Sequence, residues 1–121
     1  MATKILMKTL VLGLAASAAA SAAEPPSAMV TWAGCAGALV AKTLLLEDKS
    51  QAPKLQAMAR RALAHAKTVD NPEKQTPGQI DGLAMSTARS YLDEAKKSPE
   101  QRAKLESLAE GCAGLVAKLP D

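Results

Sequence analysis

Aromatic residues are nearly absent from this chain. Among 121 residues it has no Phe, one Trp and one Tyr, which are Trp32 and Tyr91. Alanine is abundant instead, and it buries little apolar surface per residue, so a core built from it gains little hydrophobic free energy. We therefore expect stability to depend on close packing between helices and on covalent cross-linking.

Histidine is equally scarce, and this excludes several kinds of site. A Ser-His-Asp site would require His65, the only histidine, to be held in a cleft, and no neighbouring residue indicates one. The chain has no Cys-x-x-Cys-His sequence, which excludes covalent haem attachment. Met58 lies on the same expected helix as His65, so the two cannot hold opposite faces of one haem. The acidic pairs at 47–48 and 93–94 are adjacent in sequence and point apart on a helix. We expect no catalytic, cofactor-binding or metal-binding residues, and we expect the protein not to be an enzyme.

Acidic residues are missing from the first 23 positions, where Lys4 and Lys8 give the start a positive charge. A short apolar stretch follows at 10–16, and then a run of small residues with Ala-x-Ala at 20–22. This order is typical of a cleavable secretory signal peptide, and the apolar stretch is too short to span a bilayer. We predict that residues 1–23 are this signal, that 24–121 form a single small helical domain, and that the protein is periplasmic or secreted.

A strong net charge is also lacking. The full chain carries +3, and removing Lys4 and Lys8 with the signal leaves +1. We therefore do not expect a nucleic acid as partner. A membrane surface is not expected either, because acidic residues are interleaved with the basic ones, which we expect to form a solvated face. These basic residues are Arg60, Arg61, Lys67, Arg89, Lys96 and Lys97.

No stretch shows the alternation of a half-buried strand, and the apolar residues recur with helical spacing. Prolines and polar runs divide the chain into helical segments expected at 28–47, 53–69, 77–97 and 99–119. The last two begin with a hydroxyl residue, a proline and a glutamine in the capping-box pattern, at 76–79 and 98–101. These segments predict an all-α fold, an antiparallel up-down-up-down four-helix bundle.

The chain has only two cysteines, Cys35 and Cys112. In the predicted bundle both lie at similar distances from the same end, on the first and last helices. Each is flanked by Gly and Ala, which would let two helix backbones approach as closely as a disulfide requires. We predict a Cys35–Cys112 disulfide; a pair of free buried thiols and an intermolecular bridge are the alternatives.

The first helix is unusually poor in charge, since Lys42 is its only charged residue between 28 and 46. One apolar row can face the bundle, and a second row lies on the other side: Met29, Ala33, Ala36, Val40 and Leu44. A helix that is apolar all round is normally buried all round, so the second row is a candidate partner surface. The alternative is that its small residues form ordinary protein surface. A membrane span is weakened by Gly34, Gly37, Thr31 and Lys42.

These patterns favour a noncatalytic periplasmic or secreted protein that acts by protein–protein contacts through the first helix, as a binding, chaperone-like or inhibitor module. Its partner would be a second copy, giving a homodimer, or another periplasmic protein. Acid-stress periplasmic chaperones are similar in class, being small, helical and single-disulfide, with a Trp shortly before the first Cys as Trp32 precedes Cys35 here. In this chain, however, the second Cys lies near the C-terminus. The alternative function is a small-ligand or haem carrier with an alanine-lined cavity.

Overall fold

The computed structural model describes residues 25–120, and over this range the chain contains four α-helices, one short 3₁₀-helix and no strand. The elements are α3 (Ala28–Leu45), η1 (Lys49–Gln51), α4 (Ala52–Ala66), α5 (Pro77–Ala95) and α6 (Pro99–Ala117). The all-α prediction is therefore confirmed. The predicted signal peptide at 1–23 lies outside the described residues.

Local capping residues determine where the helices begin. Thr76 and Gln79 form the predicted capping box: the Thr76 Oγ1 accepts the Gln79 N–H at 3.1 Å, and the Gln79 Oε1 accepts the Thr76 N–H at 2.8 Å. At α6, the Ser98 Oγ accepts the Gln101 N–H at 3.1 Å. Each bond satisfies a first-turn donor that would otherwise lack a helical partner.

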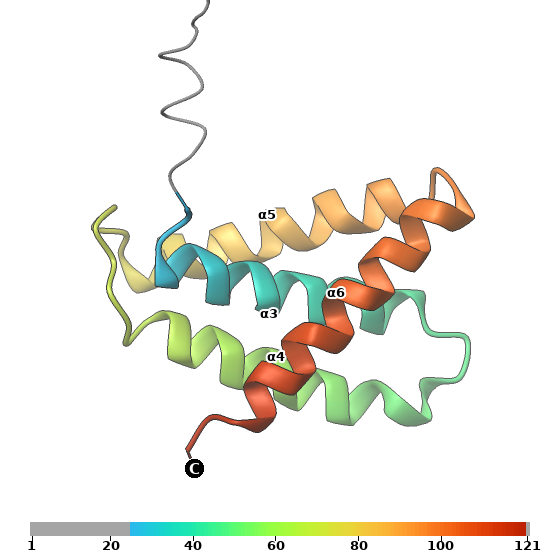
Figure 1. Ribbon diagram of the computed structural model, residues 1–121, viewed down its shortest axis with the longest axis horizontal. Coiled ribbons are helices and arrows are strands. Elements are labelled where there is room, and N and C mark those ends of the chain that lie inside the picture. The colour runs from blue at the N-terminus through green and yellow to red at the C-terminus, as the bar shows by residue number, and fades with distance from the viewer. Residues whose placement is uncertain (1–24, 121) are drawn as a thin grey trace, which may run out of the picture.

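Helix α3 occupies the centre of the molecule. It lies between α4 and α5, and α6 crosses over it obliquely (Figure 1). Helices α4 and α5 have little contact with each other, whereas both pack extensively against α3. A regular up-down-up-down bundle is therefore not confirmed, because one helix is surrounded by the other three.

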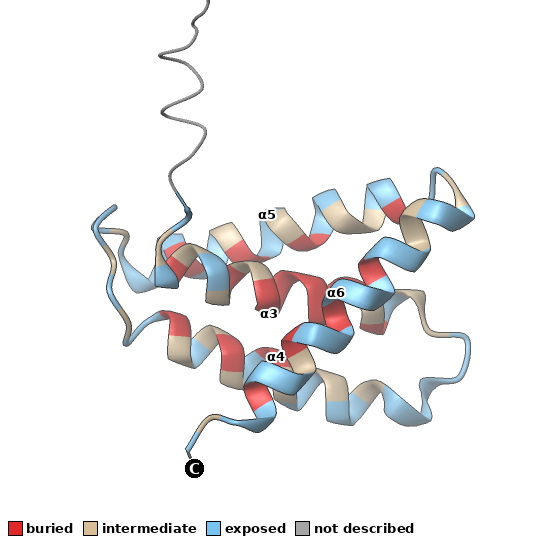
Figure 2. Ribbon diagram, in the orientation of Figure 1, coloured by how far each residue is buried: buried red, intermediate tan, exposed pale blue. Residues whose placement is uncertain are grey.

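Buried residues are concentrated on α3 (Figure 2). The core that α3 shares with the other helices consists mainly of alanines, and the largest fully buried side chains are Met29, Leu39, Ile80 and Val116. At Gly37 the backbones of α3 and α5 nearly touch, because an added Cβ would lie 2.8 Å from the Ala84 carbonyl oxygen. Close backbone approach thus compensates for small side chains, as the composition predicts.

Cationic side chains bind the free carbonyls at the helix C-termini. The Arg102 Nη2 donates to the Leu45 carbonyl at the end of α3, at 2.9 Å. The Arg61 Nη2 donates to the Leu119 carbonyl beyond the end of α6, at 3.0 Å. Such bonds satisfy carbonyls that have no partner within the helix, and a positive charge is favoured at that end of the helix dipole. Both arginines therefore join one helix to another.

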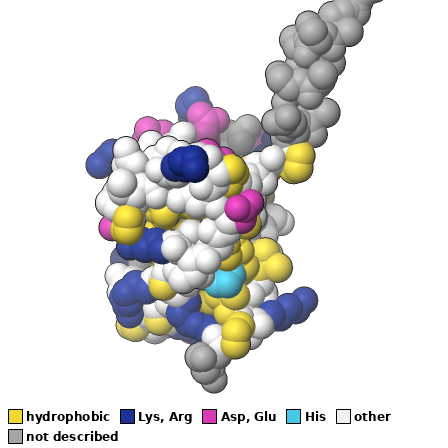
Figure 3. Space-filling model, turned by 90° about the vertical axis from the view of Figure 1, so that its left-hand side faces the viewer, with side chains coloured by type: hydrophobic (Ala, Val, Ile, Leu, Met, Phe, Trp, Pro, Cys, Tyr) yellow, Lys and Arg dark blue, Asp and Glu magenta, His cyan; other side chains and the backbone are white. Residues whose placement is uncertain are grey.

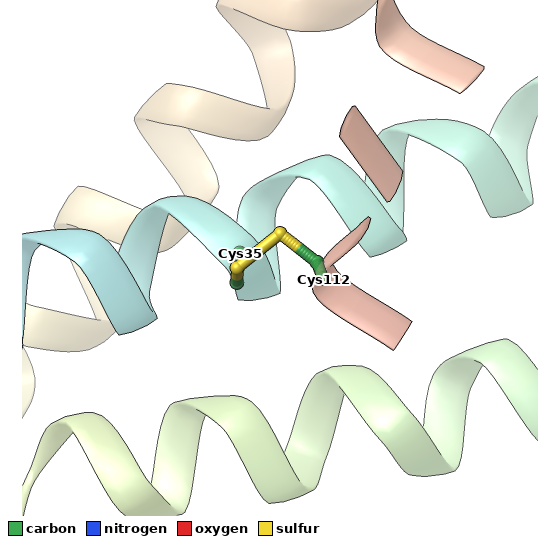
Figure 4. The surroundings of a disulfide bond; sticks show 2 residues. All are labelled: Cys35 and Cys112. Carbon is green, nitrogen blue, oxygen red and sulfur yellow. A yellow bond between two sulfur atoms is a disulfide. The ribbon is translucent and has the colours of Figure 1, made fainter. Parts of the chain in front are cut away.

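The predicted disulfide is confirmed. Cys35 on α3 and Cys112 on α6 are bonded, with their Cα atoms 5.4 Å apart (Figure 4). The explanation from the flanking glycines is wrong, however. A Cβ added at Gly34, Gly111 or Gly114 would meet no atom within 4 Å, so these glycines are not what brings the helices together.

Candidate functional site

The apolar row predicted as a partner surface on α3 is mostly internal. Met29, Ala33 and Ala36 are buried in the core of the domain, so their assignment to an outward surface is corrected. Only Val40, which is half-buried, and Leu44, which is 58% exposed, retain solvent-accessible surface. The physical reason is the central position of α3, which places other helices against its second row as well as its first.

The same position accounts for the hydropathy of α3. By length and composition, Ala28–Leu45 is the one helix among the described residues that would be able to cross a membrane. Half of this segment is buried within the domain. A core helix surrounded by other helices is expected to have this composition, because it has no solvent-facing side that would need polar residues.

An apolar groove lies beside the disulfide, where α6 crosses α3 next to α5. We call it the disulfide groove. It has a volume of about 380 Å³. Its lining comes from α3, α5 and α6 together with Pro26, two residues before α3: Pro26, Val30, Thr31, Gly34, Cys35, Leu83, Thr87, Tyr91, Leu108 and Cys112. No Asp, Glu, Lys, Arg or His belongs to this lining.

A second depression of about 190 Å³ extends the disulfide groove along the seam between α5 and α6. The two share Tyr91 and Leu108. Charged side chains enter only in this extension, where Glu94 and Lys104 contribute to the lining. The result is an apolar depression with a polar end, which is the arrangement expected of a surface that receives an apolar anchor from a partner.

Two residues of the disulfide groove are not explained by the packing of the domain itself. Leu108 is 40% exposed, although it lies on the same face of α6 as the buried Cys112 one turn later. Gly34 lies in the interior of α3, where glycine costs about 1 kcal/mol relative to alanine. Because an added Cβ at Gly34 would meet nothing within 4 Å, the packing of the domain does not require a glycine there.

The described residues offer no cluster of metal-ligating side chains. No group of three or more His, Cys, Asp or Glu side chains in residues 25–120 is placed to hold a metal ion. His65 packs edge-on against Trp32, with ring centroids 4.6 Å apart. It also lines a shallow depression with Arg61 and Thr68 at the end of α6, away from the disulfide groove.

Several alanines, the residue type that the alternative carrier function would place in a cavity lining, belong to the packed core. Ala36, Ala59, Ala62, Ala84 and Ala109 belong to one buried cluster with both cysteines, and each is at most 5% exposed. The depressions found lie between side chains at the protein surface; one of the largest is near the turn between α5 and α6. These alanines and the two cysteines thus form a closely packed part of the interior.

The sequence did not predict the disulfide groove. It places the groove residues on the correct helices, but their apolar character suggests that they are buried in the core. Tyr91 and Leu108 belong to the apolar stripes of their helices, which predicts core positions for both. In the structure Tyr91 is only half-buried and Leu108 is 40% exposed, so neither is a core residue. Gly34 lies in the middle of a strongly apolar helix, but so does Gly37, which packs against α5, so the sequence carried no clear signal for the groove. Comparison of the chain with models of protein families, with curated proteins and with solved structures finds no match.

Proposed function

We propose that this protein is a noncatalytic, exported helical-bundle protein that acts through protein–protein contacts made in the disulfide groove. It would serve as a binding, chaperone-like or inhibitor module, with a second copy of the chain or another periplasmic protein as its partner. The observation that carries the proposal is the apolar groove itself, which exposes Leu108 beside an open Gly34. This surface replaces the outward row of α3 as the candidate contact site.

The composition of the disulfide groove supports a protein partner. Contact residues that contribute most binding energy are apolar or aromatic groups inserted into a desolvated pocket with a polar rim. Here Leu83, Tyr91 and Leu108 supply apolar walls, while Glu94 and Lys104 lie at one end. The polar side-chain groups of the groove lining are the hydroxyls of Thr31, Thr87 and Tyr91, and the lining contains no carboxylate, amine or imidazole.

Export is supported by the disulfide and by the predicted signal at 1–23. Structural disulfides persist in oxidising compartments such as the bacterial periplasm and are rare in the cytosol. Cys35 and Cys112 are 5% and 3% exposed, and both belong to the lining of the groove. A protein that depends on this bond to hold its contact surface together would require such a compartment.

Site-specific photo-crosslinking tests the proposal in the exported protein. A photoreactive residue replaces Leu108 in one variant and Leu115 in a matched control. Both are exposed leucines on α6, but only Leu108 lines the groove. We expect a discrete crosslinked species from position 108, little from position 115, and loss of the species when Gly34→Leu fills the groove. Equal crosslinking at both positions, or a species that persists in the Gly34→Leu background, would contradict the proposal.

A further inference from the structure

The outward side of α4 has a charge pattern unlike the rest of the chain. From Lys49 to Val69 there are five Lys or Arg residues and no Asp or Glu, whereas the chain as a whole is nearly balanced. Figure 3 shows the end of the molecule at which α4 finishes: Lys and Arg side chains lie around the single histidine, His65, in the lower half, whereas the acidic side chains in view lie higher, together with further Lys and Arg side chains. The local excess of positive charge in the sequence from 49 to 69 is thus carried to one part of the molecular surface.

Not all of these cations are available for a partner. Lys67 pairs with Asp81 on α5 at 2.7 Å, and Arg61 donates to carbonyls at the end of α6, so both hold the fold together. Lys54 and Arg60 are exposed, and within the part of the chain that the structure describes neither forms an ion pair. These two residues therefore define the cationic face of α4.

Small residues lie between the cations on this face. Ala57 and Ala64 are both exposed, and their spacing of seven residues places them on the same side of α4, about two turns apart. The distance at which two helices pack depends on the side chains at the contact, and alanine allows a close approach. The absence of a large apolar side chain from these exposed positions disfavours insertion into a bilayer, which requires bulky apolar residues.

We infer that the cationic face of α4 binds an acidic helical segment of a partner protein. Ala57 and Ala64 would allow the partner helix to approach α4 closely. Lys54 and Arg60 would pair with carboxylates on either side of that contact. Opposite charges across such an interface select the partner and speed its association more than they strengthen binding. This surface is separate from the disulfide groove, so the inference does not depend on the proposed function of that groove.

Fluorescence anisotropy tests the inference with defined probes. The intact disulfide-bonded protein is titrated into a labelled alanine-based helical peptide with glutamates along one face, and into the same peptide with glutamine in their place. We expect binding of the glutamate peptide only, weakened roughly tenfold between about 20 and about 200 mM NaCl because exposed charges are screened. These measurements use the wild-type protein and need no variant to fold.

A pair of charge-reversal variants assigns the binding to α4. Lys54→Glu with Arg60→Glu is expected to abolish peptide binding. Arg89→Glu with Lys96→Glu makes the same change in net charge at two exposed residues, one on α5 and one at its C-cap, and is expected to leave most of the binding. Equal losses in both variants, equal binding of the glutamine peptide, or binding to phosphatidylglycerol vesicles without binding to the peptide would each overturn the inference.

Discussion

Gly34 and Gly37 lie about one turn apart on α3, and they face different surroundings. A Cβ at Gly37 would lie 2.8 Å from the Ala84 carbonyl oxygen and 3.0 Å from the Ala88 nitrogen, both of which belong to the backbone of α5. A Cβ at Gly34 would meet no atom within 4 Å. The fold therefore requires glycine at 37 and gains nothing from glycine at 34.

Alanine substitutions at these two positions are expected to change stability in opposite directions. Gly37→Ala should lower the free energy of unfolding by about 1–3 kcal/mol, because α3 and α5 must separate to admit the methyl group. Gly34→Ala should raise it by about 0.5–1 kcal/mol, because alanine has the higher helix propensity. Urea unfolding of both variants without reductant measures the difference. Changes of the same sign would show that the described approach of α3 to α5 is wrong.

The sequence does not distinguish these glycines, and this limits what can be predicted at the scale of single residues. Glycines flank both cysteines in similar contexts, which suggested that they admit the disulfide. The close approach that the structure shows is instead at Gly37, against α5. Helical spacing predicts which residues share a face, but the neighbour that covers the face is a property of the tertiary structure.

At the scale of helices, the starts were predictable because they depend on local interactions. The third and fourth helices begin at Pro77 and Pro99, as the capping patterns indicate. The position of α3 was not predictable in the same way. Its apolar second row is equally consistent with an external partner and with internal neighbours, and only the oblique path of α6 together with flanking α4 and α5 decides between them.

Helix α6 is held on α3 by the Cys35–Cys112 bond and by a modest apolar contact. Its buried residues are Leu105, Ala109, Cys112 and Val116, so only two of them are large aliphatic side chains. The bond closes a loop with a sequence separation of 77, and such a cross-link restricts the unfolded chain strongly in the chain-entropy treatment. The stability of α6 on the domain should therefore depend on it.

Replacing both cysteines by serine is expected to lower the free energy of unfolding by about 2–5 kcal/mol. Thermal and urea unfolding of the wild type and of Cys35→Ser with Cys112→Ser measures the effect. Reductant should destabilise the wild type by a similar amount and leave the double variant unchanged, which controls for direct effects of the reductant. If the unfolding midpoint of the wild type is the same with and without reductant, packing alone holds α6 in place.

At the scale of the whole molecule, two consequences follow, one from the low content of large side chains and one from the arrangement of the helices. The interior is closed by helix backbones in near contact, with alanines between them. Several of the larger apolar side chains remain at least partly at the surface, including Leu108, Leu115 and Met85. Composition predicted the first consequence. The second could not be predicted, because it follows from the angle at which α6 crosses α3 and leaves the disulfide groove beside it.

The central claim, that the disulfide groove is the contact surface of an exported protein, is tested most directly by native mass spectrometry without reductant. The measurement compares wild-type protein isolated from the periplasm with the Gly34→Leu variant. We predict that the wild-type chain lacks residues 1–23 and the two hydrogens lost in forming the disulfide, and that it is bound to a second copy or to another protein. The variant should be processed and disulfide-bonded in the same way but should lack that partner. A monomer carrying a small molecule, or a partner retained equally by Gly34→Leu, would contradict the account.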